Sequence, residues 1–270
     1  MHGVLRSALS ARLEILEAQP EVETARPPLL FIHGAFAGAW TFAEHFLPYF
    51  AAHGFPAYAL SLRGHGGSYG REALTWASLA DFVEDLEETI EAIGETPVLV
   101  GHSMGAVVVM KYLERAEAPA AALIAPVPPH GLLPASLTLA IAKPGLLVEL
   151  NNMLATGRAS IDAMHQALFA GPVPAEKIVE YYPRFQSESQ RAIWDMMLFD
   201  LPLSWRMRRP PMLVLLAERD ALFPVAQSRT GFAAIGLRTE VLEEVGHAVV
   251  LEPGWQRAAD RLVRWLTGGG

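Results

Sequence analysis

The stretch Val98-Leu-Val-Gly-His-Ser-Met-Gly-Ala-Val-Val-Val109 places a serine between two glycines, after one apolar run and before another. Pro97 to Val100 has the length and composition of a short buried strand, and Met104 to Leu113 is predicted as a helix that opens directly after the serine. Such a tight turn would force Ser103 into a strained backbone conformation and expose its hydroxyl above the sheet. The glycines alone would equally suit a turn in which the serine has no chemical role. The remaining sequence is therefore needed to distinguish this interpretation from a nucleophilic serine.

Short apolar runs alternate with longer helical patterns along the chain, which is typical of an α/β fold with a mainly parallel sheet covered by helices. The runs predicted as buried strands are Leu29–Ile32, Ala57–Leu60, Val98–Val100, Ala121–Ile124 and Met212–Leu216. Val241–Leu242 is expected in a last strand, and Leu13–Glu17 as an antiparallel edge. Ser78–Ile93 has apolar residues at helical spacing, with Ser78 as the expected N-cap and Gly94 as the C-terminal stop.

Residues 128–203 interrupt this alternation. They are rich in Leu, Met and Ala, contain several prolines, and include no convincing strand. We therefore expect residues 1–127 and 204–270 to form the α/β core. Residues 128–203 are expected to form a helical cap, inserted after the sixth strand and resting on the C-terminal edge of the sheet.

The composition excludes several classes of function. The 270 residues carry a net charge of -8, which argues against nucleic acid or an anionic membrane as a partner. The chain has no cysteine, so neither disulfides nor thiolate chemistry is expected. Neither a signal peptide nor a transmembrane segment is apparent, and we expect a cytoplasmic protein, monomeric or homodimeric. No metal-binding pattern or phosphate loop occurs, so no metal and no cofactor are expected.

Chemistry at Ser103 needs partners, because a serine hydroxyl is a poor nucleophile until an adjacent base takes its proton. His247 follows the last predicted strand in a Gly-His loop, where it can reach the serine and act as that base. Asp220 comes four residues after a buried strand, at the sheet edge where α/β proteins assemble their sites, and would orient the imidazole. Glu218, two residues earlier, competes with Asp220 for this role.

Four landmarks make the chain similar to the α/β-hydrolase superfamily over nearly its whole length. In chain order they are a candidate oxyanion loop, the loop after the next strand, the Gly-x-Ser-x-Gly elbow, and an acid followed by a histidine. Their sequences are Phe31-Ile-His-Gly-Ala-Phe36, Ser61-Leu-Arg-Gly-His-Gly-Gly-Ser68, Gly101-His-Ser-Met-Gly105, and Leu215-Leu-Ala-Glu-Arg-Asp220 with Val245-Gly-His247. The order serine, acid, histidine is the order found in that superfamily.

The resemblance implies that Asp220 rather than Glu218 is the acid of the triad. The tetrahedral intermediate needs two aimed N–H donors, and Met104 N–H lies at a helix N-terminus that favours negative charge. The resemblance points to Ala35 or Phe36 for the second donor, and we favour Phe36. His33 is expected to orient this loop.

The other histidines are given structural or surface roles. His65 is expected to be structural, and His102 to be packed or hydrogen-bonded behind the elbow. His130 and His165 are expected at the surface.

A serine at the elbow separates this chain from the haloalkane dehalogenases and epoxide hydrolases of the same fold, which have aspartate there. Acyl transfer to Ser103 from a small-molecule, hydrophobic, uncharged carboxylic ester is therefore the leading hypothesis. C–C bond hydrolase activity is less favoured, since Ala248 stands where such enzymes often carry tryptophan. Lactonase, perhydrolase and hydroxynitrile lyase activities stay open, the last depending on Lys143 or Lys177. A non-catalytic ligand-binding protein is the remaining alternative, although such proteins usually lose a triad member.

Overall fold

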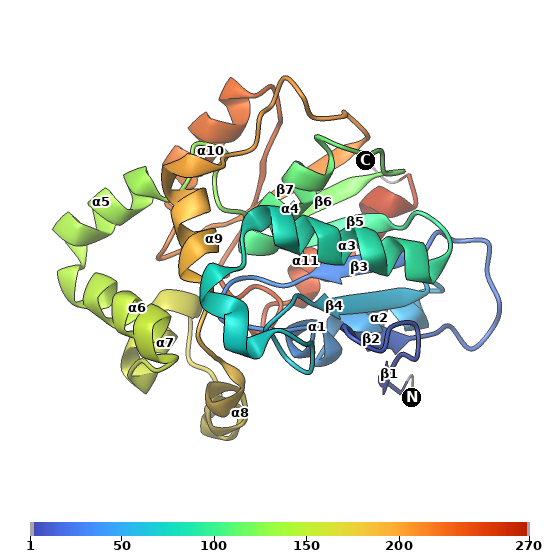
Figure 1. Ribbon diagram of the computed structural model, residues 1–270, viewed down its shortest axis with the longest axis horizontal. Coiled ribbons are helices and arrows are strands. Elements are labelled where there is room, and N and C mark those ends of the chain that lie inside the picture. Colours follow the sequence, from blue (N-terminus) through green and yellow to red (C-terminus); the bar gives the residue numbers. More distant parts are fainter. Residues whose placement is uncertain (1–2, 269–270) are drawn as a thin grey trace.

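The computed structural model describes residues 3–268, and its strands form one eight-stranded sheet (Figure 1). The order across the sheet is β1-β2-β4-β3-β5-β6-β7-β8. In chain order the strands are β1 (Leu5–Arg6), β2 (Glu14–Ala18), β3 (Leu29–Ile32), β4 (Ala57–Ser61), β5 (Val98–His102), β6 (Ala121–Ile124), β7 (Met212–Ala217) and β8 (Glu240–Leu242).

The six strands from β3 to β8 run parallel, whereas β2 pairs with β4 and β1 pairs with β2 in antiparallel fashion. This arrangement confirms the predicted α/β class and the antiparallel edge. Strand β1 was not anticipated, because its two exposed residues are too few to show an alternating pattern. The elbow strand is also longer than expected, since β5 continues through Gly101 to His102.

Helices occupy both faces of the sheet and the long connection between β6 and β7. The α-helices are α1 (Trp40–Ala43), α2 (Phe46–Ala52), α3 (Leu79–Ile93), α4 (Met104–Tyr112), α5 (Leu133–Ala142), α6 (Pro144–Thr156), α7 (Ile161–Leu168), α8 (Ala175–Tyr181), α9 (Gln190–Trp194), α10 (Val225–Ala234) and α11 (Gln256–Leu266). Short 3₁₀ turns form η1 (Arg71–Trp76) and η2 (Tyr182–Arg184), and a π-helical turn, η3 (Asp195–Phe199), continues α9.

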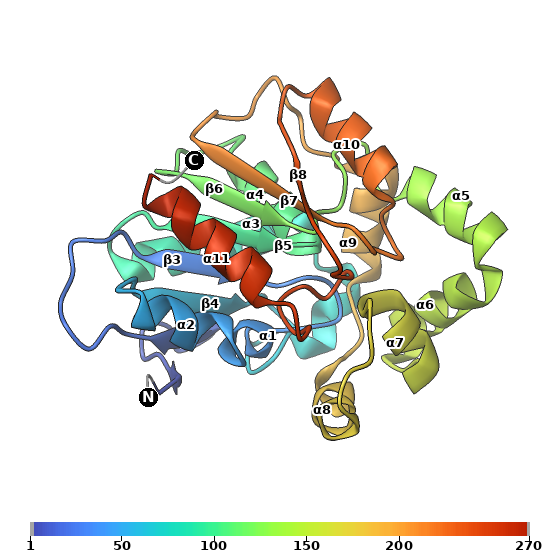
Figure 2. The ribbon, with the colours of Figure 1, turned by 180° about the vertical axis from the view of Figure 1, so that it is seen from behind.

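The sheet lies between two helical layers, with α3 and α4 on one face and α1, α2 and α11 on the other (Figure 2). Alternate residues of a strand point to opposite faces, so Ile32 packs under α3 and α4 while Phe31 packs with Phe42 and Phe46 on the other side. Within residues 3–268, no helix combines the length and hydrophobicity needed to cross a membrane.

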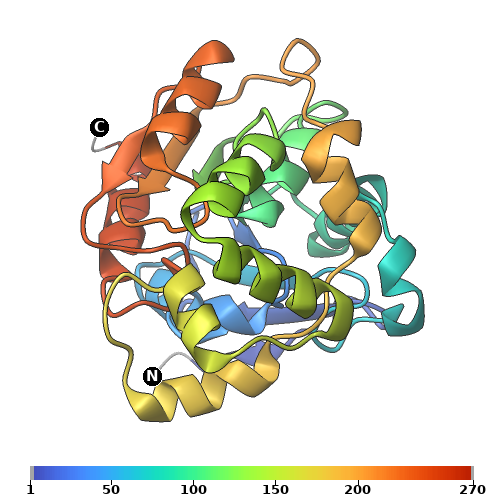
Figure 3. The same ribbon diagram turned by 90° about the vertical axis from the view of Figure 1, so that its left-hand side faces the viewer.

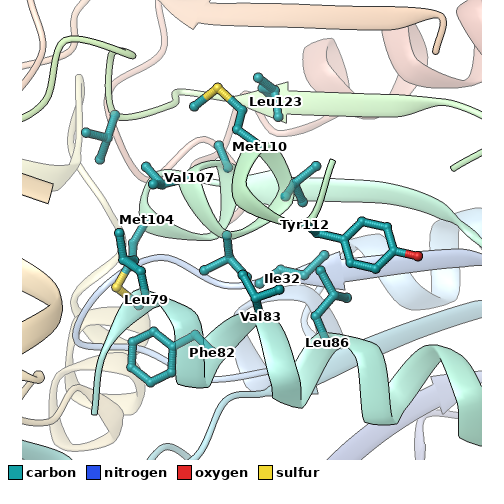
Figure 4. Packing of buried hydrophobic residues seen from close by; sticks show 14 of the residues in the cluster. Ile32, Leu79, Phe82, Val83, Leu86, Met104, Val107, Met110, Tyr112 and Leu123 are labelled. Atoms are coloured by element: carbon teal, nitrogen blue, oxygen red, sulfur yellow. The ribbon is translucent and has the colours of Figure 1, made fainter. Parts of the chain in front are cut away.

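Helix α3 shows how the sequence pattern becomes packing. Ser78 and Asp81 form a capping box at its start, and Gly94 ends it in a left-handed conformation with φ 84°, as the sequence predicts. Its apolar face, including Phe82 and Val83, is buried against α4 (Figure 4). This contact anchors the elbow helix within the helical layer that the two helices share on this face of the sheet.

The connection from β6 to β7 contains helices α5 to α9, which lie beyond the carboxyl ends of the strands (Figure 3). We call residues 128–203 the inserted segment. None of its described elements is a strand, as expected. The inserted segment shares its core with the rest of the chain, because Ala192 of α9, Met196 of η3 and Ala135 of α5 are buried in the same cluster as α3 and α4. The division of the chain into core and cap at residue 203 stays a prediction.

Replacing Gly105 by alanine is expected to destabilise the protein. An added Cβ would lie 2.2 Å from Ile32 O and 2.6 Å from His33 O, and backbone atoms of a central strand cannot easily move aside. Overpacking of this kind costs about 1–3 kcal/mol or more. Urea unfolding of Gly105→Ala should therefore give a clearly lower free energy of unfolding.

Gly145→Ala is the matched control, since a Cβ there meets no atom within 4 Å and the residue lies in helix α6. We expect this variant to be unchanged or stabilised by up to about 1 kcal/mol. Equal losses in the two variants would contradict the proposed close contact at the elbow.

Candidate active site

The elbow is formed where β5 passes directly into α4. Ser103 occupies the junction with φ 53° and ψ -115°, a strained conformation for a residue other than glycine, as the sequence predicts. Its backbone N–H donates to Ile124 O of the neighbouring strand at 3.1 Å. An added Cβ at Gly101 would lie 2.4 Å from Gly105 O, so only glycine permits this approach. The side chain of Ser103 is therefore fixed at the N-terminus of α4.

The structure brings Ser103, His247 and Asp220 together in one hydrogen-bonded line. His247 Nε2 lies 2.9 Å from Ser103 Oγ, and His247 Nδ1 lies 2.8 Å from Asp220 Oδ2. The three residues come from the loops after β5, β8 and β7, whose carboxyl ends meet at one edge of the sheet. All three side chains are buried.

The acid is held by its own loop. Asp220 Oδ1 accepts hydrogen bonds from the N–H groups of Leu222 (2.8 Å) and Phe223 (2.9 Å), which leaves Oδ2 facing His247. A carboxylate at this distance requires a hydrogen on Nδ1, so the lone pair of Nε2 faces the serine hydroxyl. Glu218 is not bonded to His247, and it accepts from Glu244 N–H at 2.8 Å.

The loop after β3 lies directly against the elbow. An added Cβ at Gly34 would lie 3.0 Å from Ser103 Cβ and from His102 Nδ1, so glycine is required for this approach. The backbone N–H groups of Ala35 and Met104, which line the same cavity as Ser103, have no protein acceptor among the described residues. Met104 is the first residue of α4, where the helix leaves its N–H groups unpaired and its dipole favours an anion.

The predicted donor Phe36 requires a correction. Its N–H donates to Glu188 Oε2 at 3.0 Å, and the residue has a left-handed φ of 66°. An N–H committed to a buried carboxylate is not available to an oxyanion. Ala35, the alternative raised by the sequence, keeps a free N–H in the same loop.

Two histidines beside the site are held neutral by burial. Burial lowers the pKa of His33 well below its usual range, and its Nε2 accepts from Leu62 N–H while Nδ1 lies 2.7 Å from Gly34 O. Burial likewise lowers the pKa of His102 to about 3, and its Nε2 donates to His247 O at 2.8 Å. His33 thus orients the glycine loop, and His102 orients the backbone of His247.

The remaining histidines lie outside the line of hydrogen bonds. His65 is fully buried, with its ring 4.9 Å from that of His33, and contacts Glu188. His130 and His165 are partly exposed and do not line the cavity described below. Within residues 3–268, no three acidic or histidine side chains gather closely enough to hold a metal ion.

A largely apolar cavity of about 380 Å³ opens above Ser103 and His247. The inserted segment supplies much of its wall, including Ala135 and Leu139 of α5, Leu147, Leu150 and Met153 of α6, and Met164 of α7. None of the described residues that line it is Asp, Glu, Lys or Arg. Lys143 and Lys177, on which a lyase reaction would depend, are not among them, and Lys177 is ion-paired with Glu44 and Glu180.

Glu188 and Glu252 are two buried carboxylates that the sequence did not single out. Glu252 accepts hydrogen bonds from Ala170 N–H of the inserted segment and from Gly246 N–H beside His247. Burial raises the pKa of Glu252 in spite of these two donors. Neither residue belongs to a recognisable motif. Each bonds to a group that is distant in the sequence, so its role can be identified only from the structure.

Replacing His102 by glutamine is expected to flatten the pH dependence of stability. The unfolded chain protonates His102 near its ordinary pKa of about 6.5, whereas the folded protein does so only near 3. As the pH falls below about 6.5, the unfolded state binds a proton that the folded state does not, so the free energy of unfolding decreases by up to about 1.4 kcal/mol per pH unit.

Glutamine can keep a donor to His247 O but does not titrate. Urea unfolding from pH 7 to 5 should therefore show a smaller loss of stability in His102→Gln than in the wild type, by about 2 kcal/mol at pH 5. Because His33 shifts stability in the same direction in both proteins, the difference between them isolates His102. Identical pH profiles would contradict a neutral, buried His102.

Comparison with known proteins places these features in a family. The model of the alpha/beta hydrolase family matches residues 29–264. A monoacylglycerol lipase from Mycolicibacterium smegmatis is 29% identical over 245 residues, which cover 83% of this chain and 82% of that protein.

Solved structures share the fold at low sequence identity. An esterase from Exiguobacterium antarcticum has a TM-score of 0.71 at 18% identity, with 99% of this chain and 100% of that chain covered. A bromoperoxidase from Bacillus anthracis has a TM-score of 0.73 at 19% identity, with 98% and 99% covered. With the family match spanning most of the chain, and with the sheet and its elbow built as described, this protein belongs to the α/β-hydrolase family.

Proposed function

We propose that this protein is a serine hydrolase that cleaves a hydrophobic, uncharged carboxylic ester through an acyl-enzyme on Ser103. The observation that carries the proposal is the hydrogen-bonded line from Asp220 through His247 to Ser103 at the base of an apolar cavity. Such a line is the arrangement by which a hydroxyl is converted into a nucleophile.

Acylation begins when Ser103 Oγ attacks the ester carbonyl carbon and His247 Nε2 accepts the hydroxyl proton. Asp220 stabilises the resulting imidazolium through Nδ1–H, at the 2.8 Å contact already present. The tetrahedral intermediate then expels the alcohol, which takes the proton from His247 as the C–O bond breaks. An ester of Ser103 and the acyl group remains.

The negative oxygen of the intermediate requires two aimed donors. We assign these to the N–H groups of Met104 and Ala35, which are free of protein acceptors and lie on either side of Ser103 in the cavity wall. The dipole of α4 adds to the stabilisation at Met104. Water activated by His247 then hydrolyses the acyl-enzyme and regenerates Ser103.

The substrate class follows from the cavity lining. A wall without charged side chains favours an uncharged ligand, and a volume of about 380 Å³ lies at the lower end of the range of about 300–1,000 Å³ for small-molecule sites. We propose that residues 128–203 act as the cap that binds the acyl chain. The relative named a monoacylglycerol lipase supports an ester of a fatty acid.

Ser103→Ala is expected to lower kcat at least about 10⁴-fold, because the nucleophile of a triad acts as a unit with its base. Turnover of p-nitrophenyl butyrate and labelling by a fluorophosphonate, mapped by mass spectrometry, measure this directly. Ser228→Ala is the control, since Ser228 is buried in α10 away from the cavity and should not affect labelling. An unlabelled wild-type protein without ester turnover would favour a ligand-binding protein instead.

Leu150→Trp is expected to shift the acyl preference toward shorter chains. Leu150 lies in the cavity wall and is only half-buried, so a larger side chain can occupy acyl space without overpacking the core. The kcat/KM for p-nitrophenyl decanoate should fall at least about tenfold more than that for the acetate.

Val148→Trp is the matched control on the same helix, because Val148 is 59% exposed and does not line the cavity. Its acyl preference should match that of the wild type. If Leu150→Trp reduced acetate and decanoate turnover equally, α6 would not form the acyl site.

A further inference from the structure

A short segment after the inserted helices lies against the loop that carries Ala35. We call Gln186–Ser189 the strap. It connects η2 to α9, and it contacts the loop after β3, the loop after β4 and the end of η1. The strap therefore joins the inserted segment to the structures directly behind the proposed oxyanion site.

Phe36 is held by the strap through both of its backbone polar groups. Its carbonyl accepts from Gln186 N–H at 2.9 Å, and its N–H donates to Glu188 Oε2 at 3.0 Å. Its φ of 66° is unfavourable for a residue with a side chain, and such a conformation persists only where the surroundings impose it. The strap supplies that imposed geometry one residue after Ala35.

The carboxylate of Glu188 is itself rigidly placed. It is 2% exposed, and Oε1 accepts from Ser189 N–H while Oε2 faces His65 Nε2 at 3.0 Å. His65 Nδ1 lies 3.0 Å from Arg63 O, so that ring nitrogen carries a hydrogen. The pair of His65 and Glu188 is neutral overall whichever partner holds the shared proton, and this neutrality makes its complete burial tolerable.

Gln186 fixes the strap from its other end. Its side-chain Nε2 donates to Gly64 O at 2.9 Å, and its Oε1 accepts from Gly66 N–H at 3.2 Å and from Arg71 at 2.8 Å. The strap is thus anchored on the loop after β4, independently of Phe36. It can hold the oxyanion loop because its own position is also fixed by hydrogen bonds to the loop after β4.

We propose that Glu188 is a positioning residue for catalysis. By holding Phe36 N–H, Glu188 fixes the Ala35–Phe36 peptide. The preceding N–H, that of Ala35, then points toward the oxygen that becomes negative at Ser103. This inference rests on the proposed serine hydrolase function. Without the carboxylate, Phe36 N–H is left buried and unpaired, and the loop relaxes toward a conformation with negative φ. The Ala35 donor then leaves the oxyanion, while the cavity wall that the inserted segment supplies stays in place.

The test compares Glu188→Ala and Glu188→Gln with the wild type. Removal of one oxyanion donor typically costs about 10²–10³ in kcat, and a displaced donor should cost Glu188→Ala at least about tenfold, with KM within about threefold. Glu188→Gln keeps one oxygen for Phe36 N–H but lacks a second acceptor for Ser189 N–H, so its loss should be smaller.

Inhibition by a trifluoromethyl alkyl ketone gives a readout that loss of stability alone would not affect. Ser103 Oγ adds to the ketone carbon, its proton passes to His247, and the ketone oxygen becomes the oxyanion. The inhibition constant should rise by the same factor as kcat/KM falls. Asp195→Asn is the matched control, because Asp195 is a buried carboxylate that contacts Arg191 and Leu79 N–H but neither the loop nor the cavity.

The outcomes separate this inference from the proposed function. A wild-type protein that is neither labelled at Ser103 nor active would overturn the proposed function. An active wild type, with Glu188→Ala showing normal kcat and normal ketone affinity, would overturn the role of Glu188. A drop in kcat equalled by Asp195→Asn would also overturn it, by indicating general destabilisation. If Glu188→Ala does not fold, the same comparison made with Glu188→Gln decides.

Discussion

The contact between the start of α4 and the end of β3 is the constraint on which the site depends. A Cβ at Gly105 would lie 2.2 Å from Ile32 O, and one at Gly101 would lie 2.4 Å from Gly105 O, so backbone meets backbone with no side chain between. This approach forces Ser103 into its strained conformation and directs the first N–H groups of α4 to the same side as the serine. The positions of the proposed nucleophile and of one proposed oxyanion donor are therefore consequences of a single packing requirement.

Burial gives the remaining groups their chemical state. The parallel strands bring His247 and Asp220 to the edge where Ser103 lies, and the cavity wall above them is largely apolar. Burial in that environment keeps the imidazole of His102 neutral, with its pKa lowered to about 3. His247 differs from His102 in its hydrogen bonds, because Asp220 lies against its Nδ1 and Ser103 lies against its Nε2. The rings of His102 and His247, with centroids 5.2 Å apart, thus have different hydrogen-bond partners.

The sequence predicted those features whose cause is local. Apolar runs, the N-cap and C-terminal glycine of α3 and the glycines of the elbow each depend on residues within a few positions, and the structure confirms them. Phe36 shows where local reasoning ends, because its N–H is occupied by a residue 152 positions away. Glu188 lies in a polar stretch with no motif, and its burial depends on where the inserted segment returns to the core. Only the folded chain supplies that information.

The inserted segment is tied to the loops on both sides of Ser103 by buried carboxylates. Glu188 holds the loop after β3, and Glu252 links Ala170 to Gly246, with Ala248 N–H donating to Leu168 O beside it. A lid that moved as a rigid body away from the core would have to break these bonds and leave carboxylates unpaired in the interior, which is costly. Substrate entry is therefore easier to reconcile with local movement of α5 and α6, which make neither contact. On this view the half of the segment that we propose to bind the acyl chain can adapt to the substrate, while the half bonded to the loops beside Ser103 stays fixed.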